Sequence, residues 1–117
     1  MRYGKEVLGV DFPSTIWVGI DSQTTAQTSR QLIATPGTGR CLFVTDIIIS
    51  NQDIPGYVVL VEDCSGTPLP KTIPFYFGVS SGMAKRFRTP IKVTADKNIG
   101  YTSTCSSHGV QINGFTL

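Results

Sequence analysis

The sequence predicts an all-β protein, a jelly-roll-like antiparallel β-sandwich of about eight strands with an extended N-terminal arm. Three observations lead to this fold class. Residues 41–117 show no helical period in their apolar positions. Short β-branched runs follow one another instead, separated by Gly, Pro, Asn or Asp at intervals of roughly eight to twelve residues. The length of 117 residues fits one domain, with enough chain for a two-layer core.

The first part of the chain differs in pattern from the rest. Ile16–Ile20 predicts a short strand, and residues 31–35 predict the next one. Between them, residues 21–29 are polar and have little to bury, which is typical of a solvated loop or of an arm ordered against a neighbouring subunit. We therefore divide the single domain into residues 1–39, an N-terminal arm with the first short strands, and residues 40–117, the sandwich core.

The clearest strand is Cys41–Ser50, and the Pro36–Gly39 segment predicts the turn before it. Regular alternation places Cys41, Phe43, Thr45, Ile47 and Ile49 on one face and Leu42, Val44, Asp46, Ile48 and Ser50 on the other. Both faces are largely apolar, so we expect the strand to be central and covered on both sides. Pro70 and Pro74 demote the strand around them to an edge, because proline cannot donate to a β-ladder. The remaining predicted strands lie at residues 57–63, 69–77, 83–94, 99–105 and 110–117. An immunoglobulin-like sandwich is less favoured, because Trp17 precedes every cysteine.

Composition excludes several classes of protein. The net charge of +2 is too small to predict binding to nucleic acid or to a membrane surface. No run of 18 apolar residues occurs, and the Val7–Val10 stretch is too short for a signal peptide. We expect synthesis in a cytoplasm, where Cys41, Cys64 and Cys105 stay free thiols. Charged residues make up only 15% of the chain, which fits short strands and also fits a surface partly covered by other chains.

Candidate catalytic and metal-binding residues are few. His108 is the only histidine, and we interpret it as an exposed, unpaired residue in the turn at residues 106–109. Cys105 and His108 have the spacing of half a zinc site, but Cys41 and Cys64 are isolated and structural zinc sites draw their ligands in local pairs. We predict no metal and no cofactor.

The carboxylates and glycines also favour structural roles. Glu62 and Asp63 are adjacent, so on a strand they face opposite sides and form no acid–base pair. Asp63 and Asp96 are predicted to cap turns. The Gly37–Arg40 segment lacks the Gly-Lys-Ser/Thr ending of a phosphate-binding loop, so we interpret it as a turn. We expect no enzymatic activity.

A basic cluster is the strongest candidate for binding. Arg86, Arg88 and Lys92 share parity on a regular strand, with Phe87 and Ile91 on the other face. Such a face could keep an edge strand soluble, or contact an acidic patch of a protein partner; single-stranded nucleic acid is the least favoured partner. Trp17 and the aromatic residues Tyr57, Phe75, Tyr76 and Phe77 leave a sugar-stacking platform as a further alternative.

Residues 40–117 resemble the small jelly-roll structural proteins of tailed-bacteriophage virions, including head decoration (cement) proteins. The resemblance rests on four segments: Val44–Asn51 ending in Ser-Asn, Phe87–Thr94 with its Pro-Ile entry, Asn98–Thr102, and Gly109–Phe115 closing in Gly-Phe. Residues 1–39 show no such likeness.

The resemblance implies a non-enzymatic virion protein, most simply a homotrimer seated on the major capsid protein and stabilising the head. A tail or neck component and a carbohydrate- or receptor-binding module are the alternatives. A cupin-type enzyme is disfavoured, because it requires several metal-binding histidines. The residues expected to contact partners are Arg2, Tyr3 and Lys5 in the arm, together with Arg86, Arg88 and Lys92.

Overall fold

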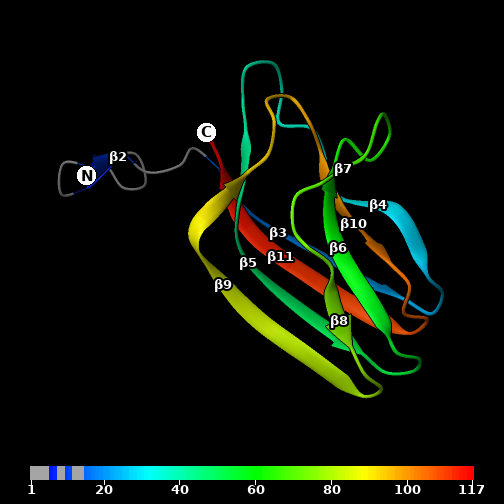
Figure 1. Cartoon of the computed structure of the whole chain (residues 1–117). Helices are drawn as coiled ribbons and strands as arrows, with labels where there is room; N and C mark the ends of the chain where they lie inside the picture. Colours follow the sequence, from blue (N-terminus) through cyan, green and yellow to red (C-terminus); the bar gives the residue numbers. More distant parts are fainter. Residues whose placement is uncertain (1–5, 8–9, 12–14) are drawn as a thin grey trace.

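Two antiparallel sheets face each other and form a β-sandwich in the computed structural model, which describes residues 6–7, 10–11 and 15–117 (Figure 1). The four-stranded sheet has the order β3-β11-β5-β9, and the five-stranded sheet has the order β4-β10-β6-β7, with β8 also paired to β6. The strands of the sandwich are β3 (Thr15–Gln23), β4 (Gln27–Ile33), β5 (Leu42–Asn51), β6 (Gly56–Glu62), β7 (Leu69–Pro70), β8 (Phe75–Phe77), β9 (Ser81–Lys92), β10 (Ile99–Ser103) and β11 (His108–Thr116). Two short strands, β1 (Glu6–Val7) and β2 (Val10–Asp11), pair with each other.

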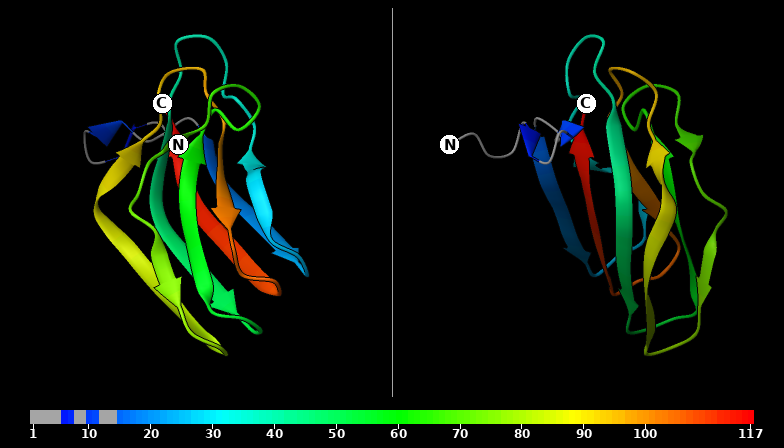
Figure 2. Two further views of the ribbon diagram at one scale, coloured as in Figure 1. Left: turned by 45° about the vertical axis from the view of Figure 1, so that its right-hand side comes forward. Right: turned by 90° about the vertical axis from the view of Figure 1, so that its left-hand side faces the viewer.

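The predicted jelly roll is confirmed by this strand order. Successive long strands alternate between the sheets, so that β3, β5, β9 and β11 lie in one layer and β4, β6, β8 and β10 in the other (Figure 2). Four of the strands on each side therefore form the two interleaved Greek keys of a jelly roll. No helix in the described part of the chain is long and apolar enough to cross a membrane.

The core lies between the sheets and takes its side chains from alternate positions of the long strands. Its fully buried members include Ile47, Leu60, Ile99, Tyr101 and Ile112. Trp17, Leu32, Met83 and other partly buried apolar residues pack against this cluster from the strands at the sheet edges. The apolar alternation of the sequence therefore corresponds to burial on the inner faces.

A β-bulge in β5 corrects the predicted division of that strand into faces. The register with β11 shifts between Asn113 and Gly114, opposite Thr45, and the Thr45 hydroxyl oxygen lies 3.1 Å from the Asn113 carbonyl oxygen. The extra residue changes the parity, so Leu42 and Val44 share the inner face with Ile47 and Ile49. The strand is central as predicted, but it is not covered on both sides: Ile48, on the opposite face, is 43% exposed.

The predicted loop at residues 21–29 is wrong in its extent. Strand β3 continues to Gln23 and β4 begins at Gln27, so only residues 24–26 connect them. The polar residues are accommodated because Asp21 accepts hydrogen bonds from Tyr101, Gln23 and Arg30, and because Thr102 accepts one from the Ser29 amide. Strands β3 and β4 thus belong to the two sheets of the sandwich.

The predicted edge strand at residues 69–77 forms as two short pieces, β7 and β8, both paired with β6. Pro74 lies between them, in keeping with the missing N–H donor of proline. The turn at Gly37–Arg40 is confirmed, since the Arg40 amide donates to the Gly37 carbonyl oxygen at 3.1 Å and both glycines have positive φ.

Candidate functional site

The outer face of the four-stranded sheet, turned away from the five-stranded sheet, carries an ordered array of side chains. Strand pairing places these side chains in four rows that run across β3, β11, β5 and β9. The rows are Ile16–Phe115–Phe43–Lys92, Val18–Asn113–Asp46–Arg86, Ile20–Gln111–Ile48–Ala84 and Ser22–Gly109–Ser50–Gly82. We call this array the outer face.

Apolar side chains dominate the half of the outer face that lies on β3. Ile16, Val18 and Ile20 are 78%, 56% and 69% exposed, although β-branched apolar residues are usually buried in a folded domain. Phe43 and Phe115 stack beside them with their ring centroids 5.0 Å apart. Ile48 is also exposed, but Gln111 lies between it and Ile20 in the same row. Exposed apolar side chains gathered along one strand are typical of an interaction site.

A small polar group lies in the middle of the outer face. The Asn113 amide donates to the Asp46 carboxylate at 2.7 Å, and the Thr45 hydroxyl donates to the same carboxylate at 2.7 Å. The Gln111 amide donates to the Asn113 side-chain oxygen at 3.2 Å. These bonds hold the side chains around the bulge in defined positions on the outer face.

Two shallow cavities flank Ile48 on the outer face. One, of about 210 Å³, lies over β3, β11 and β5 and is lined by Ile20 and Gln111 among others. The second, of about 280 Å³, lies between β5 and β9 and is lined by Asp46 and Arg86 among others. Both are below the roughly 300–1,000 Å³ of typical small-molecule sites, so the face is better suited to a protein surface than to a small ligand.

The predicted basic residues of β9 lie along the border of the outer face. Arg86 is directly opposite Asp46, and Lys92 is opposite Phe43. Arg86, Arg88 and Lys92 are exposed, while Phe87 and Ile91 pack against the core. The strand is not regular as the prediction assumed, because its register with β5 shifts between Arg86 and Ile91. None of the three cations forms an ion pair with a described carboxylate. Their role in binding stays a prediction, and Arg2, Tyr3 and Lys5 lie outside the described residues.

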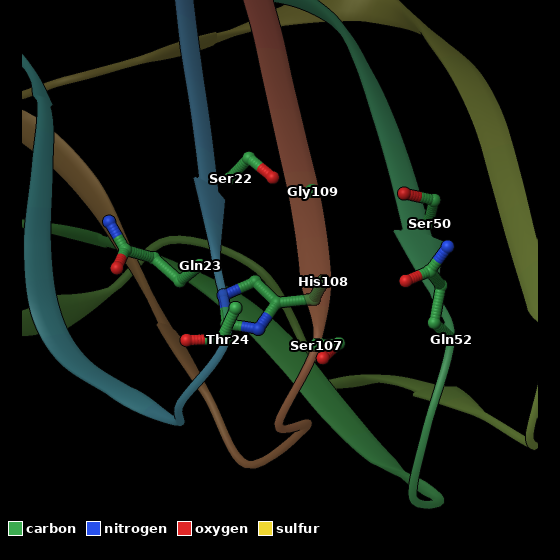
Figure 3. Close-up of a pocket in the computed structure, with 8 residues that line it drawn as sticks. All are labelled: Ser22, Gln23, Thr24, Ser50, Gln52, Ser107, His108 and Gly109. Atoms are coloured by element: carbon green, nitrogen blue, oxygen red, sulfur yellow. The ribbon is translucent and has the colours of Figure 1, made fainter.

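A polar cavity of about 190 Å³ opens at the end of the same sheet where β11 begins (Figure 3). Its lining comes from the ends of β3, β5 and β11 and includes Ser22, Ser50, Gln52, Ser107 and His108. His108 is the only titratable residue among them. The cavity is therefore the place in the described structure where a histidine and several hydroxyl groups come together.

His108 corrects the prediction of an exposed turn histidine. It is 4% exposed, begins β11, and lies in a buried hydrogen-bonded network. Its Nδ1 donates to the carbonyl oxygens of Cys105 and Ser106, both at 3.1 Å, because a carbonyl only accepts. Its Nε2 is 3.0 Å from the Tyr101 hydroxyl, which donates to the Asp21 carboxylate at 2.7 Å.

This network connects the two sheets and orients Asp21 toward the interior. Although burial opposes ionisation of Asp21, the donors Tyr101, Gln23 and Arg30 lower the pKa of its carboxyl below the usual value. Burial and the neighbouring Asp21 charge raise the pKa of Tyr101 well above its usual value. The proton therefore stays on Tyr101, and the group acts as a fixed polar bridge.

The geometry provides no nucleophile–base pair around His108. Both ring nitrogens are occupied by Tyr101 and by backbone carbonyls, and no serine hydroxyl of the described residues bonds to the ring. A general base must reach the proton that it abstracts. The sequence missed this network because Asp21 lies 80 residues before Tyr101 in the chain.

The other candidate residues have structural partners. Glu62 is buried, accepts a hydrogen bond from the Thr94 amide and pairs with Lys71 at 3.2 Å, which together lower the pKa of its carboxyl despite burial. Asp63 caps the turn that follows β6, as predicted, by accepting from the Thr67 amide at 3.0 Å. Cys41, Cys64 and Cys105 are free, and burial raises the pKa of the Cys64 thiol. No group of three or more His, Cys, Asp or Glu side chains in the described ranges is arranged to hold a metal ion.

The aromatic residues are divided between core and surface. Phe77 is buried and Phe75 packs against the core, while Tyr76 is 75% exposed, as their alternation predicts. Tyr57 lies edge-on to Tyr76 with ring centroids 5.6 Å apart. Trp17 is half-buried against the core, so it offers no open platform.

The sandwich and its apolar outer face define an all-β protein of the jelly-roll class with no recognisable catalytic centre among the described residues. Comparisons with models of protein families, with curated proteins and with solved structures found no match.

Proposed function

We propose that this chain is a non-enzymatic structural protein of a tailed-phage virion, and specifically a capsid decoration protein that binds the major capsid protein and stabilises the head. The observation that carries the proposal is the outer face, where Ile16, Val18 and Ile20 are each more than half exposed. A domain that leaves such a surface uncovered gains free energy when another protein covers it, by about 25 cal/mol for each Å² of apolar area buried.

The basic border of the outer face supports attachment to an acidic partner. Arg86 and Lys92 lie opposite outer-face residues of β5, Arg88 is exposed between them on β9, and none of the three has a described carboxylate partner. Unpaired cations beside an apolar surface favour a partner with complementary acidic residues, since complementary charge guides encounter and fixes register. Protein contact is therefore favoured over the solvated edge that the sequence left as an alternative.

The resemblance of residues 40–117 to head decoration proteins supplies the virion and the homotrimer in this proposal. A structural role also accounts for the network around His108, which holds the sheets together and leaves no base free. Binding to a shell stabilises both partners by mass action, without any reaction. A tail or neck component uses the same features and differs only in which virion protein lies under the outer face.

The direct test adds the purified chain to phage heads assembled without it, and measures occupancy and the temperature at which the heads open. We expect saturable binding and a higher opening temperature. In the Arg86→Glu/Arg88→Glu variant we expect at least tenfold weaker attachment, because two attractive contacts become repulsive. Lys85→Glu is the matched control, since this exposed residue lies on the same strand with the opposite parity. Heads that never bind the chain would exclude the decoration role.

One observation favours a carbohydrate- or receptor-binding module as the second candidate. Tyr76 is exposed on the five-stranded sheet beside Tyr57, and paired aromatic rings are typical of sugar-stacking surfaces. A glycan array distinguishes the candidates: binding that disappears in Tyr76→Ala would favour the module, and an array without signal would favour the structural protein.

A further inference from the structure

The four edges of the two sheets differ in how they are protected from pairing with other strands. Unprotected edges invite strand addition, so proteins usually place Lys, Pro, bulges or very short strands there. Strand β9 carries Lys85, Arg86, Arg88 and Lys92 together with Pro90. On the five-stranded sheet, β7 and β8 have only two and three residues, and β4 shows register shifts and a positive φ at Ser29.

Strand β3 has none of these protections. Its nine residues pair with β11 in continuous register, without a bulge, and contain no Pro, Lys or Arg. Its one charged residue, Asp21, is turned inward and held by Tyr101. No other described segment pairs with the outward edge of β3, where every second residue of the strand directs its N–H and C=O groups.

We propose that a second copy of this chain pairs with β3 edge to edge, antiparallel, about a two-fold axis at Val18. Two identical edges are self-complementary in this arrangement, as in any isologous contact. The register places Ile16 opposite Ile20 of the second copy, and Val18 opposite Val18. The pair joins two four-stranded sheets into one sheet of eight strands. It sets Ile16, Val18 and Ile20 of the two copies side by side as cross-strand neighbours and leaves the outer face itself open.

The charges on the sheet favour a β3–β3 pair over a β9–β9 pair. The outward side chains of β3 from Ile16 to Ser22 are uncharged, so two copies meet without repulsion. Two β9 edges in antiparallel contact would bring Arg86, Arg88 and Lys92 of each copy close together. The choice of β3 over β9 therefore follows from residues on both strands.

This inference goes beyond the proposed function and holds whether or not the chain binds a phage head. A two-fold contact joins copies in pairs, so it requires an even number of copies in solution. A homotrimer is compatible with it only where trimers pair further, to six copies. Three copies that make no further contact would exclude a β3–β3 pair.

The first test measures molar mass by light scattering behind a sizing column, on the full chain from about 1 µM to about 0.5 mM, since a pair of edge strands is a small interface. We expect an even-numbered assembly that dissociates on dilution. Val18→Lys should weaken it about tenfold or more, because it places two ammonium groups side by side. Ile73→Lys is the control, as Ile73 is also exposed but lies outside β3. A monomer or trimer at every concentration, or equal effects of both variants, would overturn the proposal.

A second test reads the register directly and does not depend on the folding of the lysine variant. Val18→Cys should form a disulfide-linked dimer under mild oxidation, since residues at position 18 face each other across the axis. Ile16→Cys should not, because equivalent residues at position 16 would lie about 14 Å apart along the strands. Peptide mapping distinguishes these bonds from any formed by Cys41 or Cys64. Equal cross-linking at both positions, or none at position 18, contradicts the proposed register.

Discussion

The two edge strands of the four-stranded sheet, β3 and β9, are both long, but β3 carries apolar side chains where β9 carries cationic ones. Strand β3 has nine residues and β9 has twelve, and each borders the outer face. Strand β9 is cationic, contains Pro90 and shifts register against β5, whereas β3 carries exposed apolar side chains and pairs with β11 in continuous register. We therefore propose two kinds of contact for this one sheet: a charged border that binds a different protein, and a self-complementary edge that binds a second copy.

The largest expected effect comes from Gly114, on the strand that pairs with β3 on one side and with β5 on the other. Gly114 lies on β11 at the bulge of β5, and a Cβ there would meet the Phe43 carbonyl oxygen at 2.0 Å and the Trp17 ring at 2.5 Å. Neither backbone nor packed ring can move freely, so Gly114→Ala should destabilise the fold by about 3 kcal/mol in urea unfolding and weaken both contacts together. Gly78→Ala is the control, because nothing lies within 4 Å of its Cβ position. A stable Gly114→Ala protein would contradict the placement of the bulge.

Tyr101→Phe tests whether the hydrogen bond that holds Asp21 inward stabilises β3. The substitution removes the hydroxyl group between Asp21 and His108 and leaves each of them with one partner fewer. We expect a loss of about 1–3 kcal/mol in unfolding free energy and weaker self-association, since Asp21 is the only charge on β3 and its inward position depends on this bond. Tyr57→Phe provides the control, because the Tyr57 hydroxyl bonds to no described residue. Equal losses in the two variants would show that the network does not stabilise the protein.

These two predictions depend on features that the sequence predicted to different degrees. Strong period-two alternation predicted the positions of the strands from Leu42 onward, and turn residues predicted most of their ends. The bulge at Thr45 was not predictable, because a single inserted residue depends on how β11 and β5 align across 68 residues of chain. Local pattern alone therefore assigned the wrong faces to half of β5.

The sequence predicted the strand that carries Ile16, Val18 and Ile20, but not the exposure of these side chains on the outer face. The alternation of Ile16, Val18 and Ile20 with Trp17 and Gly19 is a period-two signal that predicted a strand, but it does not say which face is covered. Exposure depends on the partner sheet, which packs over Trp17 and Gly19: a Cβ on Gly19 would lie 2.9 Å from the Ile33 side chain. Asp21 and His108 were misread because a polar residue in a strand is explained only by a distant partner, here Tyr101.

Acid and alkali should act on the β3 side through the same network. The pKa of Asp21 is lowered in the folded chain, so its contribution to stability is present above its unfolded pKa of about 4 and is lost as pH falls through the folded pKa. The pKa of Tyr101 is raised, so its contribution is present below about pH 10 and is lost as pH rises through the folded value.

Urea unfolding midpoints, measured from acid to alkaline pH, test the contributions of both Asp21 and Tyr101. Asp21→Asn should reduce the loss of stability that the protein shows as pH falls. The loss that remains in this variant should depend on Glu62, whose pKa is also lowered. Tyr101→Phe should reduce the loss of stability that the protein shows as pH rises above about 10. If the two variants leave the profile of the unsubstituted chain unchanged, the network does not contribute to the pH dependence of stability.

The smallest expected effect is a difference in salt dependence between attachment through β9 and self-association through β3. Attachment through Arg86, Arg88 and Lys92 should weaken several-fold between about 50 mM and 500 mM NaCl, because mobile ions screen exposed charges. Pairing through β3 should change less than about twofold over the same range, since Ile16, Val18 and Ile20 carry no charge and apolar burial is little affected by screening. Sedimentation of the free chain and occupancy on heads, measured in the same buffers, compare the two contacts directly. Parallel weakening of both would mean that one set of contacts governs both associations, and the division of the sheet into two differently built edges would then be wrong.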